Sequence, residues 1–434
     1  MIQQKLKPDM QVCQDDYPLD WYQREFLYYA EEYQALPDRN LLTTLLWMEP
    51  YVEAATKHFG DSLLLLSHYY MGGEIVKIMN YFGGVIGDSY QLALMAVKHP
   101  EKKVIVESAV HFMAESISIL ANADQQVYIT NPKSGCTMEM LAKDFMVKPA
   151  FTQLNARYEN NILPICYMNT SGRIKAMTGE YGGAACTSSN VKKIFEWALK
   201  QNKKILFIPD RHMGENVASW VGIPKEKIAY WPAGQAAVNF NLENQSKEFI
   251  KQFDESQLIL FGSECGVHSY YHSAMVKYWQ QKNYHVVVHP ECRNEVVSVA
   301  DSFGSTSYIW DKVINDKAGT KQYAIGTENH FVKNLREVCR DKNITVVNLS
   351  DIPEMISNKK GCGCATMSRN DPPHLVAVLD LLRQGKIPEF NLVKPGDVVD
   401  EFLGTRERLN EIDQAIIVKN ARIALENMIA ITEA

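Results

Sequence analysis

Short apolar runs alternate with amphipathic stretches along most of this chain, and this alternation limits the available folds more than any other feature. Turn-forming residues bound each run, whose aliphatic and β-branched side chains predict a buried strand. The strands that we expect are Leu63–Ser67, Val104–Glu107, Val127–Thr130, Ile162–Cys166, Ile205–Pro209, Leu258–Phe261, Val286–His289, Tyr323–Gly326 and Ile344–Leu349. Strands that alternate with helices predict an α/β fold with parallel sheets covered by helices on both faces.

Three of the expected strands end in a similar polar cluster, which indicates an internal repeat. The clusters contain His68 with Tyr70, Tyr167 with Asn169, and His289 with Glu291. Each is followed by a hydroxyl residue before an expected helix and later by a cysteine; these are Ser89, Ser188 and Thr306, then Cys136, Cys265 and Cys364. Ligands of open α/β sheets bind beyond the carboxyl ends of the strands, so three such ends would line one central cavity. The alternative is that any α/β protein has polar strand ends followed by Ser or Thr helix caps.

The composition argues against several classes of partner. Among 434 residues, 45 are Lys or Arg and 51 are Asp or Glu, without a basic cluster interleaved with aromatics, so we expect no nucleic-acid partner. No apolar run is long enough to cross a bilayer, and we expect no membrane association. Nine cysteines, an odd number, fit a reducing compartment with metal-binding or catalytic thiols better than a disulfide framework. We therefore expect a cytoplasmic protein.

The segment VYITNPKSGCTM, from Val127 to Met138, reads as strand, tight loop and helix, with Cys136 at or just before the helix N-terminus. Free backbone N–H groups and the helix dipole favour a thiolate there. The alternative is a half-buried cysteine in a β–α turn. Three thiolates are one ligand short of a closed zinc site or a [4Fe–4S] cluster, and the missing ligand would leave one metal position open. An open iron can act as a Lewis acid on a substrate hydroxyl or carboxylate.

A series of short strings in a fixed order resembles the quinolinate synthase family, the iron–sulfur enzymes of de novo NAD biosynthesis. The strings are HFMAE, NPKSGCTM, YMNTSG, TSSN, PDRHMG, CGVH, HPEC, ADSFGSTS, GTE and CATMSRND, and they cover about residues 60 to 385. The resemblance implies three similar Rossmann-like domains, each a three-layer αβα unit, in a pseudo-threefold arrangement around a [4Fe–4S] cluster. It implies the condensation of iminoaspartate with dihydroxyacetone phosphate to quinolinate, with release of phosphate and water, at an iron left open for substrate.

The resemblance assigns the cluster ligands to Cys136, Cys265 and Cys364. Met367 and Asn370 follow Cys364 at the family's spacing, so Cys364 is preferred to its neighbour Cys362. A rival alignment for the second ligand has Ala236 where the thiol should be. We expect Cys186 and Cys292 to lie outside the ligand set, and we expect Cys13, Cys166 and Cys339 to be core or surface residues.

The same resemblance suggests roles for the polar strand ends. Glu291 resembles the family's acid/base carboxylate, Tyr70 a proton relay and His68 a substrate contact, so these three are the expected catalytic residues. The expected substrate-binding residues are His68, Ser89, Tyr167, Asn169, Ser188, His289, Glu291 and Thr306. The alternatives are hydrogen-bonded core residues for Tyr and His, and ordinary helix caps for the hydroxyls. Matched positions also hold Glu115, Asp210, Arg211, His212 and Glu328, for which substrate contacts and structural salt bridges cannot be separated from sequence.

We predict a helical N-terminal extension over residues 1–58 and α/β units over 59–150, 151–275 and 276–365, ending near Cys136, Cys265 and Cys364 respectively. Helices within 366–434 are expected to pack on the first unit, and the segment 231–255 is an insertion relative to the family. The apolar stripe within 400–431 fits packing on the body or on a second subunit of a homo-oligomer, which the sequence does not decide.

Two rival functions remain at this stage. The first is a metal-binding regulatory protein without turnover, in which three cysteines hold zinc or a cluster. The second is a cluster-dependent dehydratase of another substrate, since a few pocket residues decide the substrate. The quinolinate synthase reading further implies a functional link to an enzyme that produces iminoaspartate.

Overall fold

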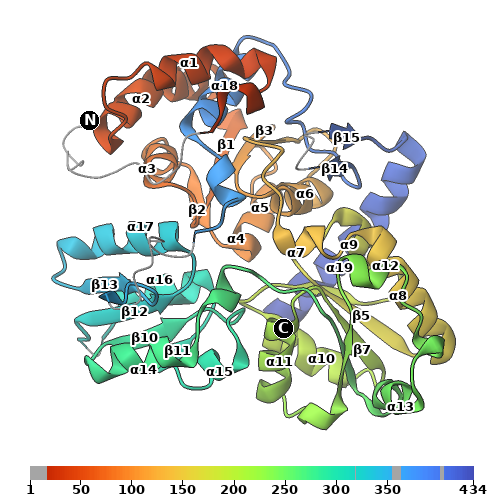
Figure 1. The fold of residues 1–434 in the computed structure, drawn as a ribbon. Coiled ribbons are helices and arrows are strands. Elements are labelled where there is room, and N and C mark those ends of the chain that lie inside the picture. Colours follow the sequence, from red (N-terminus) through yellow and green to blue (C-terminus); the bar gives the residue numbers. More distant parts are fainter. Residues whose placement is uncertain (1–16, 318, 354–362, 401–404) are drawn as a thin grey trace. The chain divides into compact units, whose positions relative to one another are not determined.

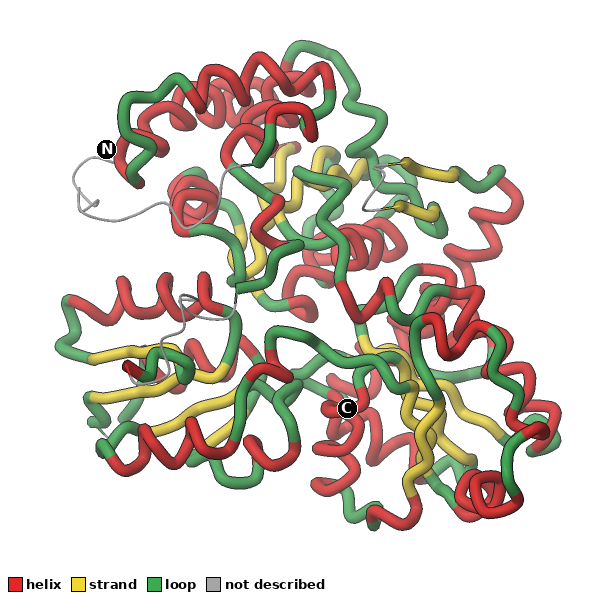
Figure 2. The backbone as a smooth tube through the Cα atoms, in the orientation of Figure 1, coloured by secondary structure: helices red, strands yellow, loops and turns green. Residues whose placement is uncertain are grey.

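The computed structural model describes residues 17–317, 319–353, 363–400 and 405–434. The chain divides into two compact units, which we describe one at a time. Figure 1 labels helices and strands of both. The first comprises Met1–Gly135, Glu328–Arg340 and Gly363–Arg408, and the second comprises Cys136–Thr327, Asp341–Cys362 and Leu409–Ala434. Figure 2 shows that strands and helices alternate in both, which confirms the predicted α/β fold with several parallel sheets flanked by helices.

A four-stranded parallel sheet with the order β2-β1-β3-β4 forms the centre of the first unit. Its strands are β1 (Leu63–His68), β2 (Val85–Gly87), β3 (Val104–Ser108) and β4 (Gln126–Ile129). All six residues of β1 are buried, as expected for a run of four leucines in a sheet covered on both faces. His68, the last residue of β1, therefore lies at the carboxyl edge of the sheet.

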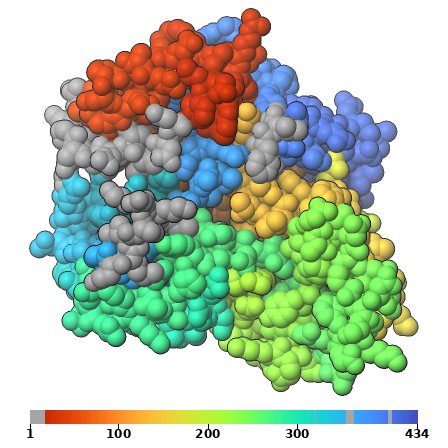
Figure 3. Space-filling model, in the orientation of Figure 1, coloured from red at the N-terminus to blue at the C-terminus, as the bar shows by residue number. Residues whose placement is uncertain are grey.

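The helices of the first unit include the predicted N-terminal extension. They are α1 (Leu27–Gln34), α2 (Leu41–Phe59), α3 (Gly73–Tyr81), α4 (Ser89–Ala93), α5 (Met95–Lys98), α6 (His111–Leu120), α17 (Asn329–Arg340) and α18 (Pro372–Arg383). The Asn40 side chain caps α2 by accepting a 3.0 Å hydrogen bond from Thr43 N–H. The helix α18 packs against α2 and α1. The residues of α1 and α2 form the red surface in Figure 3. Two short antiparallel strands, β14 (Val398–Asp400) and β15 (Thr405–Glu407), complete the unit.

The second unit contains two parallel sheets. One has the order β6-β5-β7-β9-β8 and the other has the order β11-β10-β12-β13. The strands of the first are β5 (Ile162–Tyr167), β6 (Ala184–Cys186), β7 (Lys204–Ile208), β8 (Ile228–Trp231) and β9 (Leu258–Phe261). Those of the second are β10 (His285–Val288), β11 (Ser302–Phe303), β12 (Gln322–Gly326) and β13 (Thr345–Asn348).

The three sheets share one connectivity, which supports the internal repeat inferred from the strand ends. In each, the first strand pairs with the second on one side and with the third on the other. A further strand, which is β4, β9 or β13, lies beyond the third. The middle sheet differs by one added edge strand, β8, which pairs in parallel with β9. This strand ends at Trp231, where the segment that we interpreted as an insertion begins. The division of the chain into three domains at residues 150 and 275 stays a prediction.

The helices of the second unit are α7 (Thr137–Met140), α8 (Asp144–Arg157), α9 (Gly172–Glu180), α10 (Val191–Leu199), α11 (Arg211–Trp220), α12 (Gln235–Val238), α13 (Lys247–Glu255), α14 (Ser273–Gln281), α15 (Asn294–Val297), α16 (Thr306–Ile314) and α19 (Glu411–Glu433). We expected the C-terminal helices on the first α/β unit, but only α18 packs there, whereas α19 packs along α9. Gly179 permits this close approach, because a Cβ atom there would collide with the carbonyl oxygen of Asn420. Within the described residues, no helix has both the length and the apolar character required to cross a membrane.

Candidate active site and metal centre

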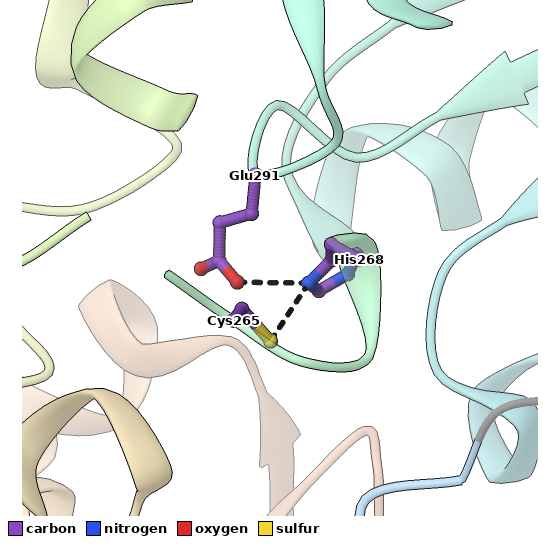
Figure 4. Close-up of side chains that lie close together, drawn as sticks. All are labelled: Cys265, His268 and Glu291. Carbon is purple, nitrogen blue, oxygen red and sulfur yellow. Dashed lines mark hydrogen bonds and ion pairs between the residues drawn. The ribbon is translucent and has the colours of Figure 1, made fainter. Parts of the chain in front are cut away.

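A tight turn after β9 brings Cys265 and His268 together in the second unit. Cys265 is half-buried, and His268 begins the short 3-10 helix His268–Tyr270 and is 2 % exposed. The Ser269 N–H donates a 2.9 Å hydrogen bond to the Cys265 carbonyl, which fixes the turn. His268 Nδ1 lies 3.2 Å from Cys265 Sγ, as Figure 4 shows. The sulfur and the imidazole therefore belong to one local structure.

The end of β10 adds a carboxylate to this turn. Glu291 follows the strand by three residues, and its Oε2 lies 2.8 Å from His268 Nδ1 (Figure 4). The Glu291 N–H donates a 3.3 Å hydrogen bond to His289 Nδ1, and the rings of His289 and His268 stack with centroids 4.5 Å apart. Cys265, His268 and Glu291 thus form a compact group, which we call the Cys265–His268–Glu291 cluster; their ligand atoms all lie within 4.8 Å of one another.

Tyr167, the last residue of β5, completes the surroundings of Glu291. Its hydroxyl donates a 2.7 Å hydrogen bond to Glu291 Oε1. Burial alone would raise the pKa of Glu291, but the charges of His268 and His289 and the hydrogen bonds from His268 and Tyr167 lower it to about 2. Burial and the adjacent carboxylate raise the pKa of Tyr167 well above its ordinary value. Glu291 is therefore a carboxylate at neutral pH, and Tyr167 keeps its proton and donates a hydrogen bond to it.

A second buried carboxyl, Asp210, lies after the end of β7. It is fully buried, and its Oδ1 caps α11 by accepting a 3.0 Å hydrogen bond from Met213 N–H. Its Oδ2 has no hydrogen-bond partner among the described residues. Burial first, and then the negative charge of Glu291, raise the pKa of Asp210 well above its ordinary value. The region thus combines a neutral carboxyl with an ionised one.

Cys136 is connected to the other polar groups of the second unit through Asn169. It is half-buried at the N-cap of α7, as the strand–loop–helix interpretation predicted, and Asn169 Nδ2 lies 3.7 Å from its sulfur. Asn169 follows Tyr167 by two residues, and the buried Lys175 side chain holds the intervening loop by donating to the carbonyls of Met168 and Thr170. A continuous series of contacts therefore runs from Cys136 through the end of β5 to Glu291, His268 and Cys265.

The first unit holds two of the predicted catalytic residues at the end of β1. His68 is 3 % exposed, and its ring packs edge to face on Tyr70 with centroids 4.6 Å apart. The Tyr70 N–H donates a 3.2 Å hydrogen bond to His68 Nδ1, which is the same local arrangement that joins Glu291 to His289. The repeat seen in the sequence is thus also a repeat of strand-end geometry.

The three predicted anion-binding hydroxyls lie next to helix starts, but other residues cap those helices. Asp88 caps α4, which begins at Ser89, and Ser305 caps α16, which begins at Thr306. Ser188 lies in the turn before α10, whose N-cap is Asn190. The capping interpretation is therefore wrong for these three hydroxyls.

Cys364, in the first unit, is half-buried and contacts Glu328 and Thr366. Its N–H donates a 3.1 Å hydrogen bond to Glu328 Oε1, and its Sγ lies 3.2 Å from Thr366 Oγ1. Burial raises the pKa of the Cys364 thiol, and the hydrogen bond with the Thr366 hydroxyl offsets only part of this rise. Cys362 and Cys13 lie outside the described residues.

The remaining cysteines that the structure describes are buried and form no disulfide; they are Cys166, Cys186, Cys292 and Cys339. Cys166 and Cys339, expected in the core or at the surface, lie in the core. That Cys186 and Cys292 are not cluster ligands stays a prediction. The residues left undecided from sequence have partners in the structure. Glu115 accepts a 2.7 Å hydrogen bond from Gly396 N–H, and Glu328 lies 2.9 Å from His330 Nδ1. Arg211 and His212 both contact Glu264, at 2.6 and 3.1 Å.

His268 is the residue that sequence reasoning missed. It was visible as the end of the string CGVH, and its spacing from Cys265 is the Cys-x-x-His pattern common at metal sites. Its contact with Glu291 joins two different strand ends, which no local pattern reveals.

Comparison with known proteins identifies the family. Residues 52–394 match the model of the family described as quinolinate synthetase A protein. Quinolinate synthases from Geobacillus kaustophilus and Bacillus velezensis are 36% and 37% identical over 364 residues, which cover 83% of this chain and 92% of each relative. The quinolinate synthase of Bacillus subtilis is 34% identical over 369 residues, covering 84% of this chain and 93% of the relative. This chain belongs to the quinolinate synthase family of NAD biosynthesis.

Proposed function

We propose that this protein condenses iminoaspartate with dihydroxyacetone phosphate to form quinolinate, with release of phosphate and water. The observation that carries the proposal is the Glu291 carboxylate, which is buried beside Cys265 and hydrogen-bonded from one side by His268 and from the other by Tyr167. A regulatory protein that holds its metal through three cysteines alone would have no use for a base held in this way.

We further propose that Cys136, Cys265 and Cys364 hold a [4Fe–4S] cluster. Their side chains fit such a group chemically, because all three are half-buried thiols that form no disulfide. Asn169 Nδ2 lies 3.7 Å from the Cys136 sulfur, and His268 Nδ1 lies 3.2 Å from the Cys265 sulfur, as N–H donors to cluster thiolates do. When bound, the cluster would supply an iron that lacks a fourth cysteine and acts as a Lewis acid on a substrate oxygen.

The acid/base work falls to the second unit in this proposal. The condensation requires removal of a proton from the carbon adjacent to the imine, and the ionised Glu291 can accept it. The Tyr167 hydroxyl holds Glu291 Oε1 by a hydrogen bond. We therefore assign proton transfer to the other oxygen, Oε2, which lies beside His268. His289 follows β10 and Asn169 follows β5, and both are assigned to substrate contact.

The first unit supplies His68, Tyr70 and Ser89 in this proposal, and the second unit also supplies Ser188 and Thr306. Tyr70 is assigned to proton relay and His68 to substrate contact, because the edge-to-face packing of the two rings fixes the phenol against the imidazole. Ser89, Ser188 and Thr306 are assigned to the carboxylates and phosphate of the substrates, since their hydroxyls are not used as helix caps. The setting that we propose is the cytoplasm, in functional connection with an enzyme that produces iminoaspartate.

The test is an assay of anaerobically purified protein. The absorption spectrum first establishes whether a cluster is present, and quinolinate is then measured after addition of iminoaspartate and dihydroxyacetone phosphate. We expect quinolinate from the cluster-containing protein and none after the cluster is removed with a chelator. An intact cluster without product would favour a dehydratase of another substrate. Bound zinc, with no product even after the zinc is removed and the protein is reconstituted with iron and sulfide, would favour the regulatory protein.

A further inference from the structure

We propose that the Cys265–His268–Glu291 cluster binds a single zinc ion when no iron–sulfur cluster is present. One thiol, one imidazole and one carboxylate converge here from two strand ends of the second unit, with Sγ–Nδ1 and Nδ1–Oε2 separations of 3.2 and 2.8 Å (Figure 4). These are ligand types that zinc accepts, and a tetrahedral zinc ion would separate them by about 3.4 to 3.6 Å. The ion would take the place of the proton that His268 Nδ1 now shares with its neighbours.

The surroundings of the three ligands are those of a prepared metal site. Metal-binding imidazoles usually donate their second N–H to a fixed acceptor, which orients the ring. His268 Nε2 lies 3.0 Å from Thr327 Oγ1, which orients the ring so that Nδ1, once it loses its proton, faces the sulfur and the carboxylate as a metal ligand. The second oxygen of Glu291 accepts the 2.7 Å hydrogen bond from Tyr167, so one oxygen is held and the other faces His268.

The donor set selects zinc over iron as a single ion. Mixed sulfur, nitrogen and oxygen ligands bind Zn²⁺ more tightly than Fe²⁺, as the usual order of divalent metal affinities requires. Three protein ligands leave a fourth position for water or another residue, so the ion remains exchangeable. His268 and Glu291 are 2 % and 5 % exposed, which limits competition from solvent.

The zinc site does not depend on the proposed function, but its competition with a cluster rests on that proposal. If Cys265 is also a ligand of the [4Fe–4S] cluster, zinc and the cluster compete for the same sulfur. Zinc-loaded protein would then fail to take up a cluster until the zinc is removed.

Cobalt(II) is the probe, because a thiolate-to-cobalt absorption band reports sulfur ligation and the d–d bands report tetrahedral geometry. The cluster-free, chelator-treated full-length protein is titrated anaerobically with cobalt, and zinc is then added to displace it. We expect one cobalt ion per chain with one thiolate ligand, displaced by one equivalent of zinc. His268→Gln and Glu291→Gln should each weaken binding by about 10-fold or more.

The matched controls are Cys136→Ser and Cys364→Ser, which should leave the cobalt spectrum and affinity unchanged. Loss of binding in these two variants, with normal binding in His268→Gln, would overturn the proposal in favour of a three-thiolate site. Failure of the wild type to bind cobalt or zinc would also overturn it. Circular dichroism of each variant shows whether the protein is folded, and X-ray absorption of the zinc form counts sulfur ligands directly.

The outcome is separable from that of the proposed function. Quinolinate formation is measured on protein reconstituted with iron and sulfide, whereas zinc binding is measured on cluster-free protein. Either result can fail without the other.

Discussion

Two deeply buried glutamates, one in each unit, show how strongly surroundings decide chemistry. Glu107 lies in β3 of the first unit and is 0 % exposed, and Glu291 follows β10 of the second unit and is 5 % exposed. Neither oxygen of Glu107 has a hydrogen-bond partner among the described residues, and burial raises its pKa well above the ordinary value. Glu291 has a partner on each oxygen, and its pKa is lowered to about 2. The same side chain is therefore a neutral core group in one place and a carboxylate in the other.

Under the proposed function, the difference separates a structural acid from a reactive one. Burial acts on both groups in the same direction, so the opposite protonation of Glu291 comes from His268, His289 and Tyr167. A buried carboxylate requires such partners, and their presence beside Cys265 fits the role that we propose for Glu291. Each prediction below alters one side of this comparison.

The largest effect is expected from Glu291→Gln. The amide keeps the shape of the side chain but cannot accept a proton, so quinolinate formation should fall by about 10²- to 10⁴-fold. The control is Glu295→Gln, which alters an exposed glutamate in α15 and should leave the rate unchanged. Initial rates with cluster content matched by absorbance test this. A Glu291→Gln rate within a few-fold of wild type would remove Glu291 from the catalytic residues.

The same carboxylate should stabilise the fold in a way that acid abolishes. The folded pKa of Glu291 is about 2 against an ordinary value of 4.5, so the stabilisation is complete above pH 4.5 and is lost as the pH falls towards 2. This amounts to on the order of 3 kcal/mol in the free energy of unfolding. Urea denaturation of cluster-free wild type should show the acid loss, and Glu291→Gln should lack that component. Parallel curves for the two proteins would mean that the pKa of Glu291 is ordinary.

Tyr167→Phe removes one of the partners that keep Glu291 ionised. It removes a hydrogen bond to a charged group, worth about 1.5 to 3 kcal/mol, and the rate should fall by about 10-fold or more. Loss of this donor also raises the pKa of Glu291, so the acid limb of the pH–rate profile should move to higher pH. Tyr158→Phe is the matched control, because Tyr158 donates a 3.1 Å hydrogen bond to the exposed Asp254. Equal profiles for the two variants would contradict the role of Tyr167.

The fold was predictable from sequence where strands are long and wholly buried. The leucine run of β1 and the apolar run of β5 are buried at every position, so their hydrophobicity alone reveals them. The short strands β2, β6 and β11 were not predicted, because two or three residues show no periodicity. The packing of α19 on α9 was also missed, since it depends on the absence of a side chain at Gly179.

The site was predictable only in its local part. The positions of His68, Tyr167 and Glu291 at strand ends could be predicted because each ends or follows a strand in a repeated pattern. The partners of Glu291 could not, because His268 and Tyr167 come from other strand ends and meet it only after the two sheets have formed. For the same reason the contrast with Glu107 is invisible in the sequence, where both are glutamates near apolar residues.

The smallest effect is expected from Glu107→Gln, which tests the neutral member of the pair. The folded protein holds the proton on Glu107 while the unfolded chain releases it above the ordinary carboxyl pKa, so wild-type stability should decline as pH rises, by up to about 1.4 kcal/mol per unit. Glu107→Gln should lack this decline, whereas Glu53→Gln, at an exposed position paired with Lys57, should retain it. Urea denaturation of cluster-free protein between about pH 5 and pH 8 measures the slopes. Identical slopes for wild type and Glu107→Gln would show that Glu107 is ionised in the fold, and the two buried glutamates would then differ in partners but not in protonation.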